Sequence, residues 1–210
     1  MDELIVHLTK IARAWTPAPV AICALGGYGR AQLCLHSDID LLIVFDTEPG
    51  KPEAQFVNAL LQPLWDLRLT VGQHVRELFE LQDPEEDNPE FLLSRLDVRP
   101  IAGDEELLAR VVVRCQAATA RRRDELRAAL RTLIRQRHAR FADTLYQLEP
   151  DIKDAPGALR DIGAVRLLRV LSAGGTPIDE TATLVDAEER LLRIRSLLHL
   201  ASGRDNNVLT

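Results

Sequence analysis

Two aspartates separated by one residue are the strongest chemical feature of the sequence. Asp38 and Asp40 lie at the start of the apolar run 41–45, which contains β-branched residues and is typical of a buried strand. Because alternate residues of a strand share a face, both carboxylates should project together, while Ile39 and Leu41 face the core. Two like charges this close repel unless they are compensated, and Mg²⁺ is held by one or two carboxylates plus substrate phosphates. The spacing therefore predicts a magnesium clamp.

A pair of glycines, Gly26 and Gly27, follows a short apolar run at residues 20–25. Glycine adopts positive φ and lets a ligand approach the backbone, and amides at a turn that leads into a helix attract phosphate. Taken singly, a Gly-Gly pair is usually an ordinary turn, and an Asp-x-Asp pair is usually a surface feature. Their combination between two apolar strands predicts a phosphate-binding turn beside a metal clamp, which is the equipment for metal-assisted nucleotidyl transfer.

The stretch from Gly26 to Leu42, GGYGRAQLCLHSDIDLL, resembles the nucleotidyltransferase motif of bacterial PII uridylyltransferases. Later segments resemble the same family in the same order: TVGQHVR at 70–76, LDVRPIAGD at 96–104, LEPDIK at 148–153, PGALRDI at 156–162 and RIRSLLHL at 193–200. The glycine and aspartate motif alone is shared by the polymerase-β-like superfamily, whereas LEPDIK and PGALRDI are specific to this family. We expect a counterpart of the family's first two domains, without its phosphohydrolase and regulatory domains.

The resemblance implies an α/β (α+β) fold, with a polymerase-β-like nucleotidyltransferase domain built on a small mixed sheet and followed by an all-α helical domain. It implies magnesium-dependent transfer of UMP from UTP to a tyrosine of the PII signalling protein, with release of pyrophosphate. Two alternatives stay open. One is transfer of another nucleotide or to another acceptor, and the other is a degenerate regulatory module that binds nucleotide without turnover.

The same resemblance suggests roles for individual residues. Asp38 and Asp40 would hold Mg²⁺, and Gly26 and Gly27 would present backbone amides to phosphate. Ser37 would either bond a phosphate oxygen or cap the strand.

Three further cations could reach the triphosphate. Arg30 would either contact phosphate or form an ordinary ion pair. Lys153 and Arg160 would either reach the triphosphate from the helical domain or form salt bridges between the domains.

A third carboxylate, which related two-metal transferases take from the neighbouring strand, is not assigned. Glu77 and Asp97 are candidates. His74 stands where related adenylyltransferases carry an aspartate, and it is a base, a ligand or a structural histidine.

Hydrophobic periodicity and turn residues suggest the elements that position these side chains. We expect strands at 20–25, 41–45 and 69–77, and helices at 2–15, 54–67, 91–99, 104–148 (as one helix or two), 157–171 and 183–201. A charged loop at 83–89 and a glycine turn at 174–175 separate some of them. Residues 104–148 contain no glycine or proline, so we place the nucleotidyltransferase domain at 1–103 and the helical domain at 104–210.

Composition limits the class of protein. The chain of 210 residues has a net charge of −6, whereas a general nucleic-acid binder would usually be basic. No apolar run approaches the roughly 18 residues of a membrane span, and the N-terminus is acidic where a signal peptide would be basic. The three cysteines lack metal-ligand spacing and suggest reduced thiols. We therefore expect a cytoplasmic protein with no nucleic-acid or membrane partner.

Overall fold

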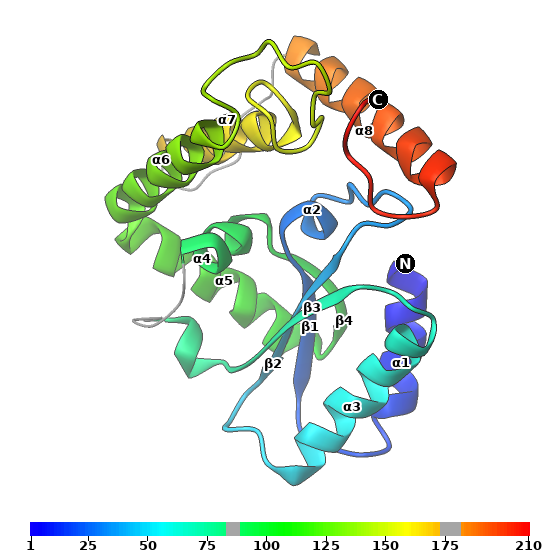
Figure 1. Cartoon of the computed structure of the whole chain (residues 1–210). Coiled ribbons are helices and arrows are strands. Elements are labelled where there is room, and N and C mark those ends of the chain that lie inside the picture. Colours follow the sequence, from blue (N-terminus) through cyan, green and yellow to red (C-terminus); the bar gives the residue numbers. More distant parts are fainter. Residues whose placement is uncertain (83–88, 173–181) are drawn as a thin grey trace. The chain divides into compact units, whose positions relative to one another are not determined.

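The computed structural model describes residues 1–82, 89–172 and 182–210 (Figure 1). The predicted glycine turn at 174–175, and all but the last residue of the predicted charged loop, lie outside the described residues. The chain forms two compact units, the first made of residues 1–33 and 38–121 and the second of residues 34–37 and 122–210.

The first unit is built on a four-stranded mixed sheet. Its strands are β1 (Val20–Ala24), β2 (Ile39–Phe45), β3 (Val71–Glu77) and β4 (Arg99–Gly103), arranged in the order β3-β2-β1-β4. β1 is antiparallel to both β2 and β4, whereas β2 and β3 are parallel. The expectation of an α/β protein with a small mixed sheet is therefore confirmed.

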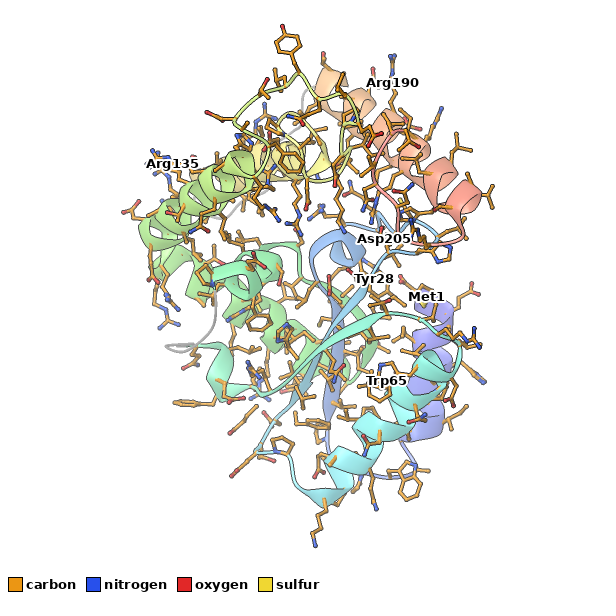
Figure 2. All side chains as sticks on the ribbon, viewed as in Figure 1. Met1, Tyr28, Trp65, Arg135, Arg190 and Asp205 are labelled. Carbon is orange, nitrogen blue, oxygen red and sulfur yellow. The ribbon has the colours of Figure 1, made fainter. Side chains whose placement is uncertain are left out.

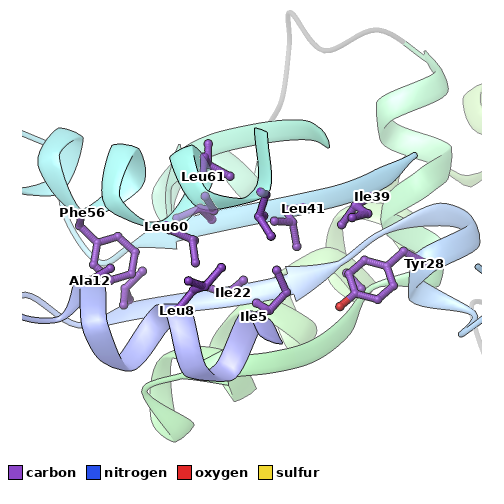
Figure 3. Close-up of a cluster of buried hydrophobic side chains, with 14 of the residues drawn as sticks. Ile5, Leu8, Ala12, Ile22, Tyr28, Ile39, Leu41, Phe56, Leu60 and Leu61 are labelled. Atoms are coloured by element: carbon purple, nitrogen blue, oxygen red, sulfur yellow. The ribbon is translucent and has the colours of Figure 1, made fainter. Parts of the chain in front are cut away.

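Helices cover both faces of this sheet. One face packs against α1 (Asp2–Ala12) and α3 (Lys51–Asp66), and Figure 3 shows the aliphatic core that they share, including Ile22, Leu41 and Leu60. The opposite face packs against η1 (Phe79–Leu81), α4 (Pro89–Ser94) and α5 (Glu105–Arg121). Because the side chains of β2 alternate between two buried layers, the strand reads as a continuous apolar run after Asp40.

The predicted helix at 91–99 is wrong in its second half. α4 ends at Ser94, the 3-10 turn η2 (Arg95–Asp97) follows, and Arg99 begins β4. Arg99 precedes Pro100, and a residue before proline is disfavoured in the helical conformation. Pro100 is tolerated in a strand because β4 lies at the edge of the sheet.

The first unit extends one helix further than the predicted domain boundary at Gly103. Leu107, Val111 and Cys115 repeat at the spacing of one helix face and are buried in the same core as Ala21 and Cys23 of β1. α5 therefore groups with the sheet, and the compact units divide after Arg121.

The second unit is helical. It contains α6 (Arg123–Ala139), α7 (Leu159–Ser172) and α8 (Ala182–Ser202), and the segment between α6 and α7 forms a bridge from Asp151 to Val208. Arg166 of α7 binds Glu188 of α8, with 2.7 Å between Nη2 and Oε2. Arg135 on α6 and Arg190 on α8 are exposed, as Figure 2 shows. Among the described helices of both units, none has the length and hydropathy of a membrane span.

Candidate nucleotide site

Asp40 projects from the beginning of β2, on the face opposite to α1 and α3. Its neighbours Ile39 and Leu41 are buried in the core, as the alternation predicts, while the side chain of Asp40 is only partly buried. Asp38 lies just before the strand and is exposed. The two carboxylates of the predicted clamp therefore differ in their surroundings, because the strand fixes Asp40 and the preceding segment carries Asp38.

The carboxylate of Asp40 occupies space that two glycines leave open. Gly72 pairs with Asp40 across the parallel β2–β3 ladder, and a Cβ atom at Gly72 would lie 2.6 Å from Asp40 Oδ1. Gly26 has a φ of +50°, which favours glycine, and its Cβ would lie 3.7 Å from Asp40 Oδ2. The sequence reasoning did not assign a role to Gly72, although a glycine inside a strand often marks the close approach of another group.

The glycine pair forms the start of a helix rather than a turn before one. α2 (Gly26–Gly29) is a single turn, closed by bonds such as that from Gly29 N to Leu25 O at 2.8 Å. The first amides of a helix have no acceptor within that helix. Gly26 and Gly27 thus carry backbone donors at the same end of β2 as Asp40.

Arg30 forms an ion pair in the structure. Its guanidinium binds the carboxylate of Asp97 on η2, and its Nε donates to Gln32 Oε1 at 2.8 Å. The ordinary ion pair that the sequence left open is therefore present. Asp97, one of the two candidates for a third carboxylate, is thus the partner of Arg30 in this ion pair.

The register of β3 separates the other candidate, Glu77, from Asp40. Glu77 pairs with Phe45, five residues beyond Gly72, which corresponds to roughly 16 Å along the strand. It also has the opposite parity to Gly72, so its side chain points to the other face. Glu77 is therefore not brought to the aspartate pair.

His74 lies on the same face as Asp40, two residues beyond Gly72. Its ring packs on that of Phe91, with 3.9 Å between the ring centroids, which favours a structural role. Within the described ranges, no three His, Cys, Asp or Glu side chains gather into a metal-binding group.

Ser37 belongs to the second unit, although it directly precedes Asp38. Its Oγ accepts a hydrogen bond from Cys34 N at 2.9 Å and another from Arg195 Nη1 at 3.1 Å. Arg195 was noted in the sequence only as part of the family-like segment 193–200. The hydroxyl thus receives two bonds from within its own unit.

Lys153 and Arg160 also lie in the second unit, and each has a carboxylate partner there. Lys153 Nζ lies 3.9 Å from Asp205 Oδ2, and Arg160 Nε lies 3.1 Å from Asp154 Oδ1. The Arg160 side chain is 51% exposed. Both salt bridges join residues of the second unit.

Asp205 gathers several cations and is labelled in Figure 2. Its Oδ1 lies 3.2 Å from Arg195 Nη2 and 2.9 Å from His199 Nε2. Burial acts to raise the pKa of Asp205, but Lys153 and Arg195 outweigh it and hold the pKa below the ordinary value. The ionised form of Asp205 is therefore favoured. In the sequence, the signal for this cluster is the spacing of Arg195 and His199, because residues four apart on a helix lie on the same face.

Comparison with known proteins gives consistent similarities. The sequence family described as GlnD PII-uridylyltransferase matches residues 127–210. The bifunctional uridylyltransferase/uridylyl-removing enzyme of Bordetella parapertussis is 35% identical over 220 residues, which cover 97% of this chain and 24% of that enzyme. The enzymes of the same description from Aliivibrio fischeri and Azotobacter vinelandii are 32% and 35% identical and cover 100% and 92% of this chain. The chain spans about a quarter of the length of these curated relatives.

A solved structure described as a toxin-antitoxin with AMP-PNP aligns with 69% of this chain and 98% of its own. The sequence identity is 14% and the TM-score is 0.35. A likeness this slight adds nothing to the assignment.

Proposed function

The chain belongs to the PII-uridylyltransferase family, and from this membership we propose that it is a magnesium-dependent nucleotidyltransferase. The proposed reaction transfers UMP from UTP to a tyrosine of a PII-like protein and releases pyrophosphate. The descriptions of the relatives support the uridylyl group. The structural observation that carries the proposal is the carboxylate of Asp40, set beside Gly26 and Gly72 at the start of β2.

The residues at this site suit Mg²⁺. Asp38 and Asp40 would hold it, because magnesium prefers oxygen ligands and is commonly bound by one or two carboxylates plus substrate phosphates. The space kept open by Gly72 sets the position of one of these carboxylates. When bound, the ion would neutralise charge on the triphosphate and on the departing pyrophosphate.

The protein's own contribution would be positioning and charge rather than covalent chemistry. The amides of Gly26 and Gly27 would bind phosphate oxygens and hold the triphosphate. A tyrosine oxygen of the acceptor would then form a bond to the α-phosphorus while the bond from that phosphorus to the bridging oxygen breaks. The electron pair would leave with pyrophosphate, and the tyrosine proton would pass to solvent.

Arg30, Lys153 and Arg160 are our candidates for further phosphate contacts, and Ser37 is a candidate for one hydrogen bond. The three cations are paired with Asp97, Asp205 and Asp154. A triphosphate carries more charge than a carboxylate and forms strong charge-assisted hydrogen bonds, so it would compete for these cations. The acceptor would be a protein rather than a nucleic acid, consistent with the net charge of −6, and we propose a cytoplasmic location.

Nucleotide binding and product formation test this proposal separately. We would titrate UTP and ATP with and without Mg²⁺ by calorimetry, and then incubate the chain with a PII protein and follow its mass. We expect UTP to bind more tightly than ATP when Mg²⁺ is present, and PII to gain one uridylyl group. Asp40→Asn should abolish the transfer, while Asp46→Asn, at the other end of β2, should not.

Each alternative outcome has a defined meaning. A preference for ATP would indicate another nucleotide. Tight magnesium-dependent binding without any pyrophosphate release would indicate a regulatory module. Full turnover by Asp40→Asn would rule out the assignment of Asp38 and Asp40 as a metal clamp.

A further inference from the structure

One face of α8 contacts three of the four residues that lead into Asp38. Cys34 Sγ lies 3.7 Å from the carbonyl oxygen of Leu192, and the amide of His36 donates to His199 Nδ1 at 3.2 Å. The bond from Arg195 to Ser37 completes the set. Positions 192, 195 and 199 follow the i, i+3, i+7 spacing of a single helix face. The segment Cys34–Ser37 therefore contacts one face of α8, through the carbonyl of Leu192 and the side chains of Arg195 and His199, and it is part of the same compact unit.

The two α8 side chains in this row are themselves fixed. The side chain of Arg195 is 7% exposed and that of His199 is 0% exposed. Asn207 Oδ1 accepts from Arg195 Nε at 2.7 Å, and Asp205 lies against both residues. A buried cation is costly unless it is paired and hydrogen-bonded, so these partners hold the guanidinium in one orientation.

The bond between His36 and His199 fixes the tautomer of the imidazole. Because Nδ1 accepts a hydrogen bond from the His36 amide, it carries no proton itself. The proton of the neutral ring is then on Nε2, which faces Asp205. The ring thus binds the segment through Nδ1, while Nε2 lies 2.9 Å from Asp205 Oδ1.

We propose that Arg195 and His199 are positioning residues for the aspartate pair, an inference that rests on the proposed nucleotidyl transfer. Asp38 follows Ser37 by one peptide bond and is exposed. It is flanked by two bonded residues: Ser37, which binds α8 within the second unit, and Ile39, whose amide donates to Thr70 O at 2.9 Å within the first. Neither α8 residue touches the substrate in this role, and each acts through the backbone that carries Asp38.

The physical reason lies in the difference between the two carboxylates. Asp40 is set by the strand and by the space at Gly72, whereas Asp38 precedes the strand. Two carboxylates bind one cation well only if both are held near the correct geometry before it arrives. A loosened segment before Asp38 would leave one good ligand and one mobile ligand.

Arg195→Lys tests the proposal, because it keeps the charge but loses the planar group that reaches Ser37, Asn207 and Asp205 together. The matched control is Arg166→Lys, which alters a buried ion pair between α7 and α8 in the same unit. Hydrogen exchange of the peptide that spans residues 34–40 reports on the anchor without any metal. Binding of Mn²⁺, measured by electron paramagnetic resonance, reports on the aspartate pair without any turnover.

We expect Arg195→Lys to accelerate exchange in the 34–40 peptide roughly tenfold, as follows from loss of a charge-assisted hydrogen bond. Mn²⁺ affinity should fall by about tenfold, the lower end of the range for residues that support metal ligands. Arg166→Lys should change neither quantity, even if it lowers the melting temperature. Ser37→Ala, which removes only the acceptor hydroxyl, should act in the same direction if Arg195→Lys does not fold.

Three results would overturn the inference. Unchanged exchange at 34–40 in both Arg195→Lys and Ser37→Ala would show that α8 does not anchor the segment. Faster exchange with unchanged Mn²⁺ affinity would show that the anchor does not position Asp38. Equal effects of Arg195→Lys and Arg166→Lys would reduce the role of Arg195 to general stability. If Asp40→Asn instead left Mn²⁺ affinity at the wild-type value, the metal clamp of the proposed function would be refuted. The exchange data would still test whether α8 anchors the segment before Asp38.

Discussion

The carboxylate of Asp40 occupies space that any side chain at Gly72 would need. The Asp-x-Asp spacing and the strand that follows were enough to predict which way Asp40 points. The partner glycine was not predictable from β3 alone, because its role depends on the register between two strands that are far apart in sequence. The sequence leaves an ion pair open as one of two roles for Arg30, but it does not identify Asp97 as the partner, because that contact is also long-range.

Gly72→Ala should impair the site more than the fold. The new methyl group would lie 2.6 Å from Asp40 Oδ1, so the carboxylate must move. We expect Mg²⁺-dependent UTP affinity to fall by about tenfold, as for other changes in the support of a metal ligand. Calorimetric titration of UTP with and without Mg²⁺ measures this loss.

Gly163→Ala on α7 is the matched control for that substitution. A Cβ at Gly163 meets nothing within 4 Å, and alanine favours a helix over glycine by about 1 kcal/mol. Its UTP affinity should equal that of the wild type. If Gly72→Ala also retained wild-type affinity, the close fit between Gly72 and Asp40 would have no role in binding.

At the scale of elements, periodic patterns predicted the long helices better than they predicted how those helices pack. The arginine-rich stretch at 104–148 was expected to hold one helix or two, and it contains α5 and α6. β4 is not predicted because it is short and contains a proline. Composition groups α5 with the later helices, although α5 packs against the sheet, because composition does not reveal what a helix packs against. The polar contacts around α7 and α8 also come from residues distant in sequence.

Asp161→Asn should destabilise the second unit. The carboxylate of Asp161 binds Arg137, lies 2.9 Å from His138 Nε2 and accepts from Gly157 N at 2.6 Å. Burial acts to raise the pKa of Asp161, but the bonds from Arg137, Gly157 and His138 outweigh it and lower the pKa. Removing the charge would leave the buried Arg137 poorly compensated, at a cost of about 2–3 kcal/mol in the free energy of unfolding.

Chemical denaturation at neutral pH measures this cost, with Asp143→Asn as the control. Asp143 also lies near His138, but its side chain is 84% exposed. An exposed pair of this kind contributes little. A similar small effect of both substitutions would show that the Asp161 contacts are not important for stability.

Acidification should destabilise the fold through His199. Burial, and then the charge of Arg195, hold the pKa of His199 below its ordinary value of 6.5, against the opposing effect of Asp205. His36 also faces the ring, with 5.8 Å between the ring centroids. The unfolded chain therefore binds the proton at a higher pH than the folded chain, and stability is lost as the pH falls below about 6.5.

Urea unfolding at about pH 7.5 and about pH 5.5 tests this expectation. The wild type should lose more stability than His199→Gln between these values, because glutamine has no proton to gain. The variant is less stable at both pH values if the contact with His36 matters. An equal pH dependence in the two proteins would assign the titration to other groups.

At the scale of the whole molecule, the chain passes from the first unit to the second and back before it enters the second for good. No compositional signal marks the short passage at Cys34–Ser37, because four residues are too few to shift an average. The passage into the larger part of the second unit is signalled by the absence of glycine and proline from residues 104–148. The compact units divide one helix after Gly103, at Arg121. Contacts, rather than composition, define these units.

Lys153→Ala distinguishes a phosphate contact from a structural salt bridge. If Lys153 leaves Asp205 for the nucleotide, the substitution should weaken UTP binding about tenfold or more and weaken UMP binding much less, because UMP lacks the β- and γ-phosphates. Affinities for both nucleotides and the melting temperature should be compared with those of the wild type. Equal losses for UTP and UMP, together with a lower melting temperature, would leave Lys153 with a structural role alone.

The attachment of Cys34–Ser37 to α8 also sets an order of events during synthesis. His36 and Ser37 are bound by side chains 163 and 158 positions later in the chain. At roughly 5–20 residues per second, a ribosome needs roughly 8–30 s to make that intervening length. All four strands have been translated by Gly103, whereas the α8 partners of the segment that enters Asp38 are translated much later. A nascent chain can therefore assemble its sheet well before its aspartate pair is secured, and such distant contacts close slowly because the entropy of a long loop is lost first.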